Sequence, residues 1–340
     1  MKKYPKVSFI ILNWNGRKWL EQLLPTVTKV AYPNTEVIVV NNGSTDDSVG
    51  FLKKHYKDIK VIELEKNVGY AKANNIGVSK AKGEYVLLIN NDTKVTPTFL
   101  NPLVEDLKDS SIGAVQPQIR SMIYPKLLDS VGSYFTCTGF LYHFGYMKPW
   151  NKKKYQDKLF AYSIKGACFL MRKKEYLKLG GLDEDFVCYV EETDLCHRVW
   201  LSGKKVLYDP RSVMYHWGGG DMQIMTKDET TMYRSFRNRF LSYVKNLSVV
   251  ELFKIIPVLF VFSEIFVVMS IVKGEFRRAF GAQIGILSVL FYLPKTLQKR
   301  KFIQKNIRKV SDREIKRYVY QNPRFSYYYH FFNNPGGYKD

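Results

Sequence analysis

Two strand-like stretches of this sequence end in side chains that could bind a metal ion. One apolar run ends abruptly in Asn90, Asn91 and Asp92, and another ends in His216, just before Trp217 and a run of glycines. A strand that only builds a core has no need of a carboxylate or an imidazole at its end. Both groups are common metal ligands. The first stretch is therefore a candidate metal-binding strand end, and His216 is a candidate ligand.

A cluster of acids is the second group that could do chemistry. Glu191, Glu192 and Asp194 open a helix that the pattern predicts over residues 191–202. Acids in a first helical turn are ordinary partners of the positive helix end. Here they follow the apolar stretch FVCYV, which could place them at the wall of a cleft. A carboxylate in that position could act as a general base.

The elements that must position these groups follow from two hydrophobic patterns in the first 120 residues. Continuous apolar runs, typical of strands covered on both faces, alternate with apolar residues at helical spacing. We expect strands at residues 7–12, 36–40, 60–64, 84–89 and 112–119, and helices at 17–30, after a cap at Ser44 or Thr45, at 69–81 and at 96–109. Residues 120–160 suggest loops or a short sheet excursion. The alternation predicts an α/β fold with a mostly parallel sheet flanked by helices.

Three of the expected strands end in short polar residues. These ends are Asn13-Trp14-Asn15, Asn41-Asn42-Gly43-Ser44 and Asn90-Asn91-Asp92. The carboxyl ends of parallel strands meet at one rim of the sheet, which is where ligands bind. Turn formation would explain one such ending, but it explains three together less well. No G-x-G-x-x-G follows the first strand, so a dinucleotide-binding fold is disfavoured.

Several stretches together resemble the inverting family 2 glycosyltransferases of the GT-A fold. They are VSFIILNWNG, EVIVVNNGSTDDSV, NVGYAKANNIGVSKAKGEYVLLINNDTKV, GACFLMRKKEYLKLGGLDEDF and YVEETDLCHRVWLSGKKVLYDP. They occur in the family's order, and the resemblance covers roughly residues 5–245. The chain is most similar to the rhamnosyltransferase-like branch, which builds bacterial surface polysaccharides. The resemblance implies a GT-A nucleotide-diphospho-sugar transferase domain at residues 1–245.

The resemblance also implies a metal site at the end of the fourth strand. The family's metal motif falls on Asn90-Asn91-Asp92, where only Asp92 keeps a carboxylate and would be the metal ligand. Asn90 and Asn91 would then contact the donor. His216 matches a histidine that completes the metal site in some members. Oxygen ligands suit Mg²⁺, whereas a carboxylate with an imidazole favours Mn²⁺.

A nucleotide-sugar site is implied at the other strand ends. Asn13 and Trp14 fall where the family contacts the base, and Asn41 falls on the carboxylate that reads it. Gly69 and Asn75 fall in the small-residue helix that flanks the nucleotide. Because Asn41 lacks the usual charge, both a UDP-sugar and a dTDP-sugar donor remain open.

The acid cluster matches the family's Glu-Asp pair, whose second acid is the catalytic base. The pair falls on Glu191-Glu192, which makes Glu192 the expected base and Asp194 the alternative. The family's reaction moves a sugar, with inversion, from a nucleotide diphosphate to a hydroxyl, here of a lipid-linked or cell-surface glycan. The cation would stabilise negative charge on the departing diphosphate.

Two other functions deserve comparison with glycosyl transfer. Asn41, Asn90 and Glu192 depart from the usual acids, so a non-catalytic or weakly active nucleotide-sugar-binding module of a polysaccharide assembly complex is the alternative. A sugar-nucleotide pyrophosphorylase would carry a Gly-rich basic loop after its first strand, which LNWNGRKWLEQL lacks.

The net charge of +22 is concentrated towards the end of the chain, where residues 227–340 hold 21 Lys or Arg against 8 Asp or Glu. Nucleic acid, an anionic membrane surface and a phosphate-rich small molecule could each explain such an excess. The charge lies beside apolar runs at residues 255–272 and 279–293. This placement favours a membrane surface over nucleic acid.

The apolar runs predict a helical, membrane-associated appendage at residues 246–340. Both runs are short for a spanning helix, and a basic connector joins them. If the pair crossed the membrane and returned, that connector would face outside, against the positive-inside tendency. We therefore expect a hairpin in the cytoplasmic leaflet of the cell membrane, bound to anionic headgroups. Two spans, a soluble helical pair and a homodimer are the alternatives.

Overall fold

The structure is a computed structural model that describes residues 4–218 and 228–328. Its first half alternates strands and helices. The elements are β1 (Val7–Asn13), α1 (Arg17–Val27), β2 (Thr35–Asn42), α2 (Ser48–His55), β3 (Lys60–Leu64), α3 (Tyr70–Lys80), β4 (Tyr85–Asn90), β5 (Thr93–Val95), α4 (Leu100–Asp106) and β6 (Ile112–Ser121).

The second half begins with short strands and ends in helices. The elements are β7 (Leu128–Ser130), β8 (Ser133–Tyr134), β9 (Tyr142–His143), η1 (Lys153–Tyr155), β10 (Leu159–Phe160), β11 (Cys168–Arg172), α5 (Lys173–Lys178), η2 (Glu184–Phe186), α6 (Glu191–Leu201), β12 (Lys205–His216), α8 (Asp228–Asn246), α9 (Val249–Val272), α10 (Phe276–Asn306) and α11 (Asp312–Val319).

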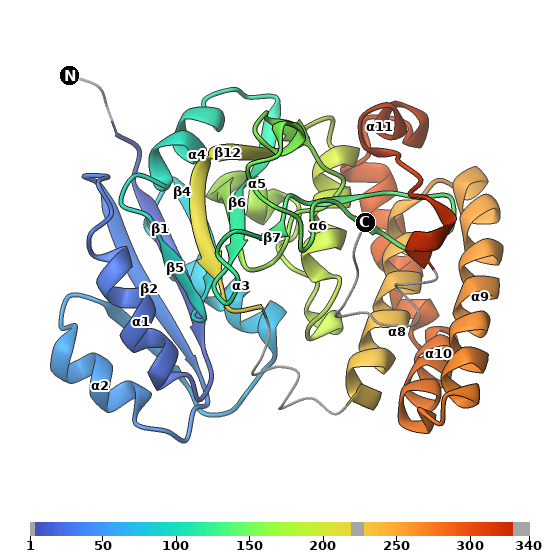
Figure 1. The fold of residues 1–340 in the computed structure, drawn as a ribbon, viewed down its shortest axis with the longest axis horizontal. Helices are drawn as coiled ribbons and strands as arrows, with labels where there is room; N and C mark the ends of the chain where they lie inside the picture. Colours follow the sequence, from blue (N-terminus) through green and yellow to red (C-terminus); the bar gives the residue numbers. More distant parts are fainter. Residues whose placement is uncertain (1–3, 219–227, 329–340) are drawn as a thin grey trace.

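A ten-stranded sheet organises the described residues. Its order is β10-β12-β6-β11-β4-β1-β2-β3, with β5 beside β12 and β7 beside β6. The strands β4, β1, β2 and β3 run parallel, whereas β11 is antiparallel to both β4 and β6. Helices α8 to α11 form a layer at the opposite end of the molecule from α1 and α2 (Figure 1). The expected α/β fold with an apolar helical appendage is confirmed.

The central strands are buried on both faces, which explains their continuous apolar runs. Ile10 of β1 and Ile38 of β2 belong to the core on one face of the sheet. Their neighbours Ile11 and Val39 belong to the core on the other face. Successive side chains of a strand point to opposite faces, so every position of such a strand must be apolar.

Two helices begin later than the sequence patterns predict. Helix α2 begins at Ser48, because Ser44 Oγ accepts a hydrogen bond from the Asn15 backbone nitrogen instead of capping the helix. Helix α4 begins at Leu100, because residues 97–99 form a turn between it and the preceding strand, β5. This short strand pairs with the end of β12 and sets His216 opposite Thr93.

The stretch at residues 120–160 is ordered more regularly than expected. It contains β7, which adds to the sheet beside β6, and the separate two-stranded hairpin of β8 and β9. Strand β7 carries Asp129, whose side chain is buried. The excursion therefore brings a carboxylate to the sheet from a region that carries no recognisable motif.

The terminal helices pack closely on one another while leaving an apolar outer face. Arg300 and Gln304 of α10 donate hydrogen bonds to carbonyls at the carboxyl end of α8. The last carbonyls of a helix have no N–H partner within the helix, so these bonds satisfy them. By length and composition α9 and α10 could each cross a membrane. Only 33% of the most apolar stretch of α9, and 28% of that of α10, is buried.

Candidate active site

The polar ends of β1, β2 and β4 form one rim, as the sequence predicts. The parallel register sets Asn13 beside Asn41 and Leu12 beside Asn90. Asn91 Nδ2 donates to Asn13 Oδ1 at 2.9 Å, and Asn13 Nδ2 donates to Asn41 Oδ1 at 3.2 Å. The side chains from three strand ends are thus joined in a continuous hydrogen-bonded row.

Asp92 and His216 lie together at this rim. His216 Nε2 is 3.4 Å from Asp92 Oδ1, and Asp92 accepts a backbone hydrogen bond from Trp217 at 3.0 Å. Asp92 Oδ1 is buried and has no hydrogen-bond partner among the described residues. Buried carboxylate oxygens are nearly always satisfied. A divalent cation between this oxygen and the imidazole would satisfy both groups, so the residues fit the expected metal.

A second carboxylate lies behind the imidazole. His216 Nδ1 is 2.8 Å from Asp129 Oδ2, and Lys165 Nζ is 2.6 Å from Asp129 Oδ1. Metal-binding histidines typically donate their other ring hydrogen to a carboxylate in this way, which fixes the ring orientation. Asp92, His216, Asp129 and Lys165 therefore form a line of alternating charge.

The electrostatics of this line follow from its geometry. Burial alone would lower the pKa of His216, but the carboxylates of Asp92 and Asp129 outweigh it and raise that pKa to about 9. Burial opposes ionisation of Asp129, yet Lys165 and His216 hold its pKa well below the usual range. Burial opposes ionisation of Asp92 as well, but the charge and hydrogen bond of His216, a backbone hydrogen bond and the charge of Lys165 together lower its pKa. Asp92 and Asp129 are therefore ionised at neutral pH.

The protein supplies only part of a coordination sphere. Within residues 4–218 and 228–328, no three His, Cys, Asp or Glu side chains converge on one point that could hold a metal. Asp92 and His216 provide two ligands. Hard divalent cations commonly complete their coordination with substrate phosphates and water, so the arrangement suits a cation that binds together with a diphosphate.

The acid pair borders the same site. The segment 165–167 connects the two, because the Asn90 backbone nitrogen donates to the Ala167 carbonyl at 2.9 Å. At the centre of the segment, a Cβ placed on Gly166 would lie 3.6 Å from Glu192 Cδ. Glu192 therefore lies across this short segment from the end of β4, near Lys165.

Both acids are poised to bind protons more tightly than an exposed glutamate. Burial raises the pKa of Glu192, and the positive charge of Lys165 offsets part of that rise. Burial, followed by repulsion from Glu192, raises the pKa of Glu191 well above its usual value. Glu191 Oε2 is buried without a hydrogen-bond partner among the described residues, whereas Glu192 is only partly buried. Glu192 is therefore the acid that solvent or a substrate can reach.

Asp194, the alternative base, is placed elsewhere. Its side chain is fully buried, and its oxygens accept hydrogen bonds from Arg198, Ser242, Lys245 and Asn246. These partners occupy the carboxylate from helices α6 and α8. Asp194 therefore ties the two helices together, and we no longer expect it to act as a base.

Asn75, which was expected to contact the nucleotide, has four hydrogen bonds to protein groups. Its Nδ2 donates to the Leu182 carbonyl and to Glu184, and its Oδ1 accepts from the Leu182 backbone nitrogen and the Tyr176 hydroxyl. These contacts fasten α3 to the loop that precedes the acid pair. Gly69 stays near the site, and its φ of +88° brings α3 so close to Val187 that a Cβ would lie 2.7 Å from that side chain. Trp14 remains 37% exposed beside the rim.

Two residues of the site carry no signal in the sequence. Asp129 lies in a stretch without periodicity or motif, and only the pairing of β7 with β6 brings it to His216. Lys165 directly precedes the matched stretch that begins at Gly166, but its residue type alone suggests no role. A search for carboxylates near a candidate histidine requires the fold, because His216 and Asp129 are 87 residues apart.

The sheet order, together with the polar rim and the acid pair, identifies the fold as a GT-A-like α/β fold. The fold is similar to that in the crystal structure of GalNAc-T7 with UDP, GalNAc and Mn²⁺. The TM-score is 0.58 at 18% sequence identity, and the match covers 72% of this chain and 48% of the other. Residues 8–180 match the model of Glycosyl transferase family 2, so the chain belongs to that family.

Two bacterial proteins are also similar to this chain in sequence. The chain is 28% identical over 219 residues to a poly-β-1,6-N-acetyl-D-glucosamine synthase from Staphylococcus epidermidis, which covers 62% of this chain and 49% of that protein. It is 26% identical over 230 residues to the O-antigen biosynthesis protein RfbC from Myxococcus xanthus, which covers 62% of this chain and 17% of that protein. The chain thus spans about half the length of the first relative and less of the second.

Proposed function

We propose that the protein is an inverting glycosyltransferase of the rhamnosyltransferase-like branch, using a UDP- or dTDP-sugar donor. The acceptor is a hydroxyl of a lipid-linked or cell-surface glycan. The observation that carries the proposal is the unsatisfied Asp92 Oδ1, 3.4 Å from the nitrogen of a histidine whose other nitrogen is bound to a buried carboxylate. The Mn²⁺ in a structural neighbour and the polysaccharide-assembly names of the relatives support it.

The donor would lie along the rim, with its diphosphate towards Asp92. Asp92 and His216 would hold Mn²⁺ or Mg²⁺, which supplies positive charge against the negative charge that develops on the departing diphosphate. Asp129 keeps the His216 ring oriented, with Nε2 towards Asp92. The rim residues Asn13 and Asn41 are buried at the strand ends, where their amides could hydrogen-bond the nucleobase of the donor.

Glu192 is the group we assign to proton transfer. Its carboxylate would accept the proton of the acceptor hydroxyl as that oxygen attacks the anomeric carbon. A base placed across the site from the diphosphate produces inversion, and such a base contributes roughly 10²–10⁴-fold to the rate. Glu192 lies so close to Gly166 that a Cβ there would be 3.6 Å from its Cδ, and the Ala167 carbonyl accepts a hydrogen bond from Asn90 of β4. Both contacts support a shared site for the general base and the donor.

The direct test is a screen of UDP- and dTDP-sugars for thermal stabilisation of the protein with and without Mn²⁺. We expect one donor to raise the melting temperature only when the metal is present, and to be hydrolysed slowly to its nucleoside diphosphate. Stabilisation without hydrolysis or transfer would support the non-catalytic binding module instead. No stabilisation by any donor would contradict the proposal.

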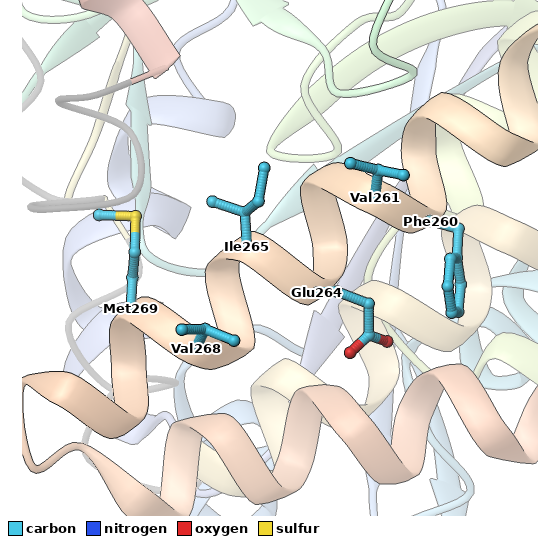
Figure 2. A pocket seen from close by; sticks show the side chains of 6 residues that line it. All are labelled: Phe260, Val261, Glu264, Ile265, Val268 and Met269. Atoms are coloured by element: carbon cyan, nitrogen blue, oxygen red, sulfur yellow. The ribbon is translucent and has the colours of Figure 1, made fainter.

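We further propose that residues 1–245 form the catalytic domain and residues 246–340 a membrane-associated unit on the cytoplasmic leaflet. Phe260, Val261 and Val268 project from α9 around a hollow of its surface, and each is more than a third exposed (Figure 2). Glu264 turns towards the neighbouring helix, where Gln283 Nε2 lies 3.5 Å from its Oε1. Pairing with Gln283 reduces the cost of an acid within this apolar surface.

The turn between α9 and α10 supports a hairpin that lies in one leaflet. Lys273 and Arg277 are exposed there, where they could meet anionic headgroups. Carbonate extraction of cell membranes separates the alternatives. We expect the protein to be released in part, whereas full retention would indicate two spans. Complete release as a dimer would indicate that a second copy covers the apolar face.

A further inference from the structure

The loop before the acid pair has an unusual backbone. Val187, Tyr189 and Val190 have φ values of +64°, +70° and +72°, and Val190 is the residue from which α6 begins. Residues other than glycine seldom adopt this left-handed region, and branched side chains do so least. Such strained segments cluster at functional sites and persist only where surrounding contacts enforce them. The contacts that enforce this loop therefore also set the position of Glu192.

One side chain of α8, that of Asn238, contacts three backbone carbonyls of this loop. Asn238 Nδ2 lies 3.0 Å from the Phe186 carbonyl, 3.0 Å from the Cys188 carbonyl and 2.8 Å from the Tyr189 carbonyl. Asn238 is fully buried, so its amide makes these three contacts without competition from water. Arg237 Nε donates to Asn238 Oδ1 at 3.0 Å, which fixes the amide with its nitrogen towards the loop.

Ion pairs secure the start of the same loop. Asp183 pairs with Lys245 of α8 and with Lys299 of α10. Asp185 Oδ1 is 2.6 Å from Lys295 Nζ, and its Oδ2 is 2.6 Å from Lys299 Nζ. The loop is thus held at its start by charges and at its left-handed centre by the Asn238 amide. The Ala71 backbone nitrogen, which donates to the Val187 carbonyl, and Arg234, which donates to Cys188 Sγ, add to this. The partners in α8 and α10 lie beyond the residues that match the family model.

We infer that Asn238 is a positioning residue, which holds Glu192 in place by fixing the three loop carbonyls before it. The inference rests on the proposed function, in which Glu192 accepts a proton. Asn238 itself does not reach the site. Among the residues that the structure describes, no hydrogen bond joins Asn238 to the rim formed by β1, β2 and β4, so we expect the donor to bind as well without the amide.

The test compares donor hydrolysis with donor binding in matched variants. Asn238→Leu keeps the size of the side chain and removes the donor group, and Asn238→Ser keeps one donor. Phe236→Leu is the control, because Phe236 lies on the same helix but packs on Phe140 and Phe266, away from the loop. Rates are measured with Mn²⁺ and the sugar nucleotide that stabilises the wild type, well below the lowest melting temperature.

We expect Asn238→Leu to lower kcat by roughly tenfold to hundredfold, as for a misplaced catalytic group, without changing the donor dissociation constant. Asn238→Ser should fall between it and the wild type, and Phe236→Leu should retain the wild-type kcat. Hydrogen exchange at residues 186–192 should accelerate in Asn238→Leu alone. If Asn238→Leu does not fold, the same comparison is made with Asn238→Ser.

Two outcomes would overturn the inference, and they differ from failure of the proposed function. An Asn238 variant that retains the wild-type kcat, or that loses kcat only as far as the control does at equal stability, shows that the amide does not position the base. Loss of donor binding in parallel with kcat would show a general structural role instead. A wild-type protein that neither binds nor hydrolyses any sugar nucleotide contradicts the proposed function itself and removes the reaction in which Asn238 would act.

Discussion

His216 holds Asp129 at 2.8 Å with one ring nitrogen and faces Asp92 at 3.4 Å with the other. The imidazole is thus set between two carboxylates, of which only Asp129 is satisfied by a second partner, Lys165. This asymmetry gives the two carboxylates different roles. In the proposed site, Asp129 would orient the ring and Asp92 would keep an oxygen for a cation.

Asp129→Asn should weaken Mn²⁺ binding without removing a ligand. The amide can turn its nitrogen towards His216 and no longer stabilises the orientation with Nε2 towards Asp92. Loss of such a supporting carboxylate typically costs 10–100-fold in metal affinity. Titration of Mn²⁺ by electron paramagnetic resonance, with UDP present, measures the change. Asp106→Asn is the control, because Asp106 is a buried carboxylate paired with Lys158 away from the rim, and equal losses in both variants would contradict the assignment.

Glu192→Gln should abolish transfer and leave donor binding nearly intact. The amide keeps the size of the side chain but cannot accept a proton, so the loss should approach the roughly 10²–10⁴-fold contribution of a general base. Isothermal titration with the donor and a turnover assay separate the two effects. Near-normal turnover would exclude Glu192 as the base.

Asp194→Asn should instead reduce stability. It leaves Arg198 without its buried carboxylate partner and removes one of the two carboxylates that Lys245 contacts. Removing one partner of a buried ion pair costs about 3–5 kcal/mol. Urea denaturation would show this as a lower midpoint. Glu105→Gln, at an exposed pair with Arg211, should cost less than about 1 kcal/mol, and an equally small effect at Asp194 would contradict its structural role.

The acid limb of the pH–rate profile should lie above that of an ordinary glutamate, whose pKa is about 4.3. Burial raises the pKa of Glu192, so the base is protonated, and inactive, at higher pH than an exposed carboxyl would be. Lys165→Met removes a charge that lowers this pKa and should move the limb to still higher pH. The profile of kcat at saturating donor and metal measures both, and a limb near pH 4 would be the contrary result.

Leu290→Ser combined with Phe291→Ser should weaken binding to vesicles that contain anionic lipid. These α10 side chains are 72% and 82% exposed, so their replacement leaves the core unchanged. Burying one large apolar side chain is worth about 1.5–3 kcal/mol, so the pair should reduce vesicle affinity at least about tenfold. Co-sedimentation measures the loss. Leu177→Ser, at an exposed leucine of α5, should have no effect, and equal binding by all three proteins would argue against α10 as the lipid contact.

Strand and helix positions in the first half of the chain were predictable because their signals are local. A strand covered on both faces must be apolar at every position, as in β1 and β2, and this is visible without the fold. The rim was predictable for a related reason. Parallel strands end at the same edge, so Asn13, Asn41 and Asn90 had to meet once the sheet was correct.

The roles of individual acids were not predictable in this way. Asp194 and Glu192 are two residues apart in one helix, and their types do not distinguish a base from a tether. The decision depends on α8, which presents Lys245, Asn246 and Ser242 to one carboxylate. The contacts of Asn75 were not predictable for the same reason, because its partners at Leu182 and Glu184 lie more than 100 residues away.

The sequence by itself determined the α/β architecture, the polar rim and the family to which the chain belongs. These features depend on hydrophobic periodicity and on short sequence motifs, and both are visible within a few neighbouring residues. The tertiary structure alone decided that Asp129 supports His216, that Asp194 is structural and that Asn238 holds the strained loop before Glu192. Those relationships are contacts between distant segments, and a side chain's chemistry depends on which partners and how much water the fold leaves around it.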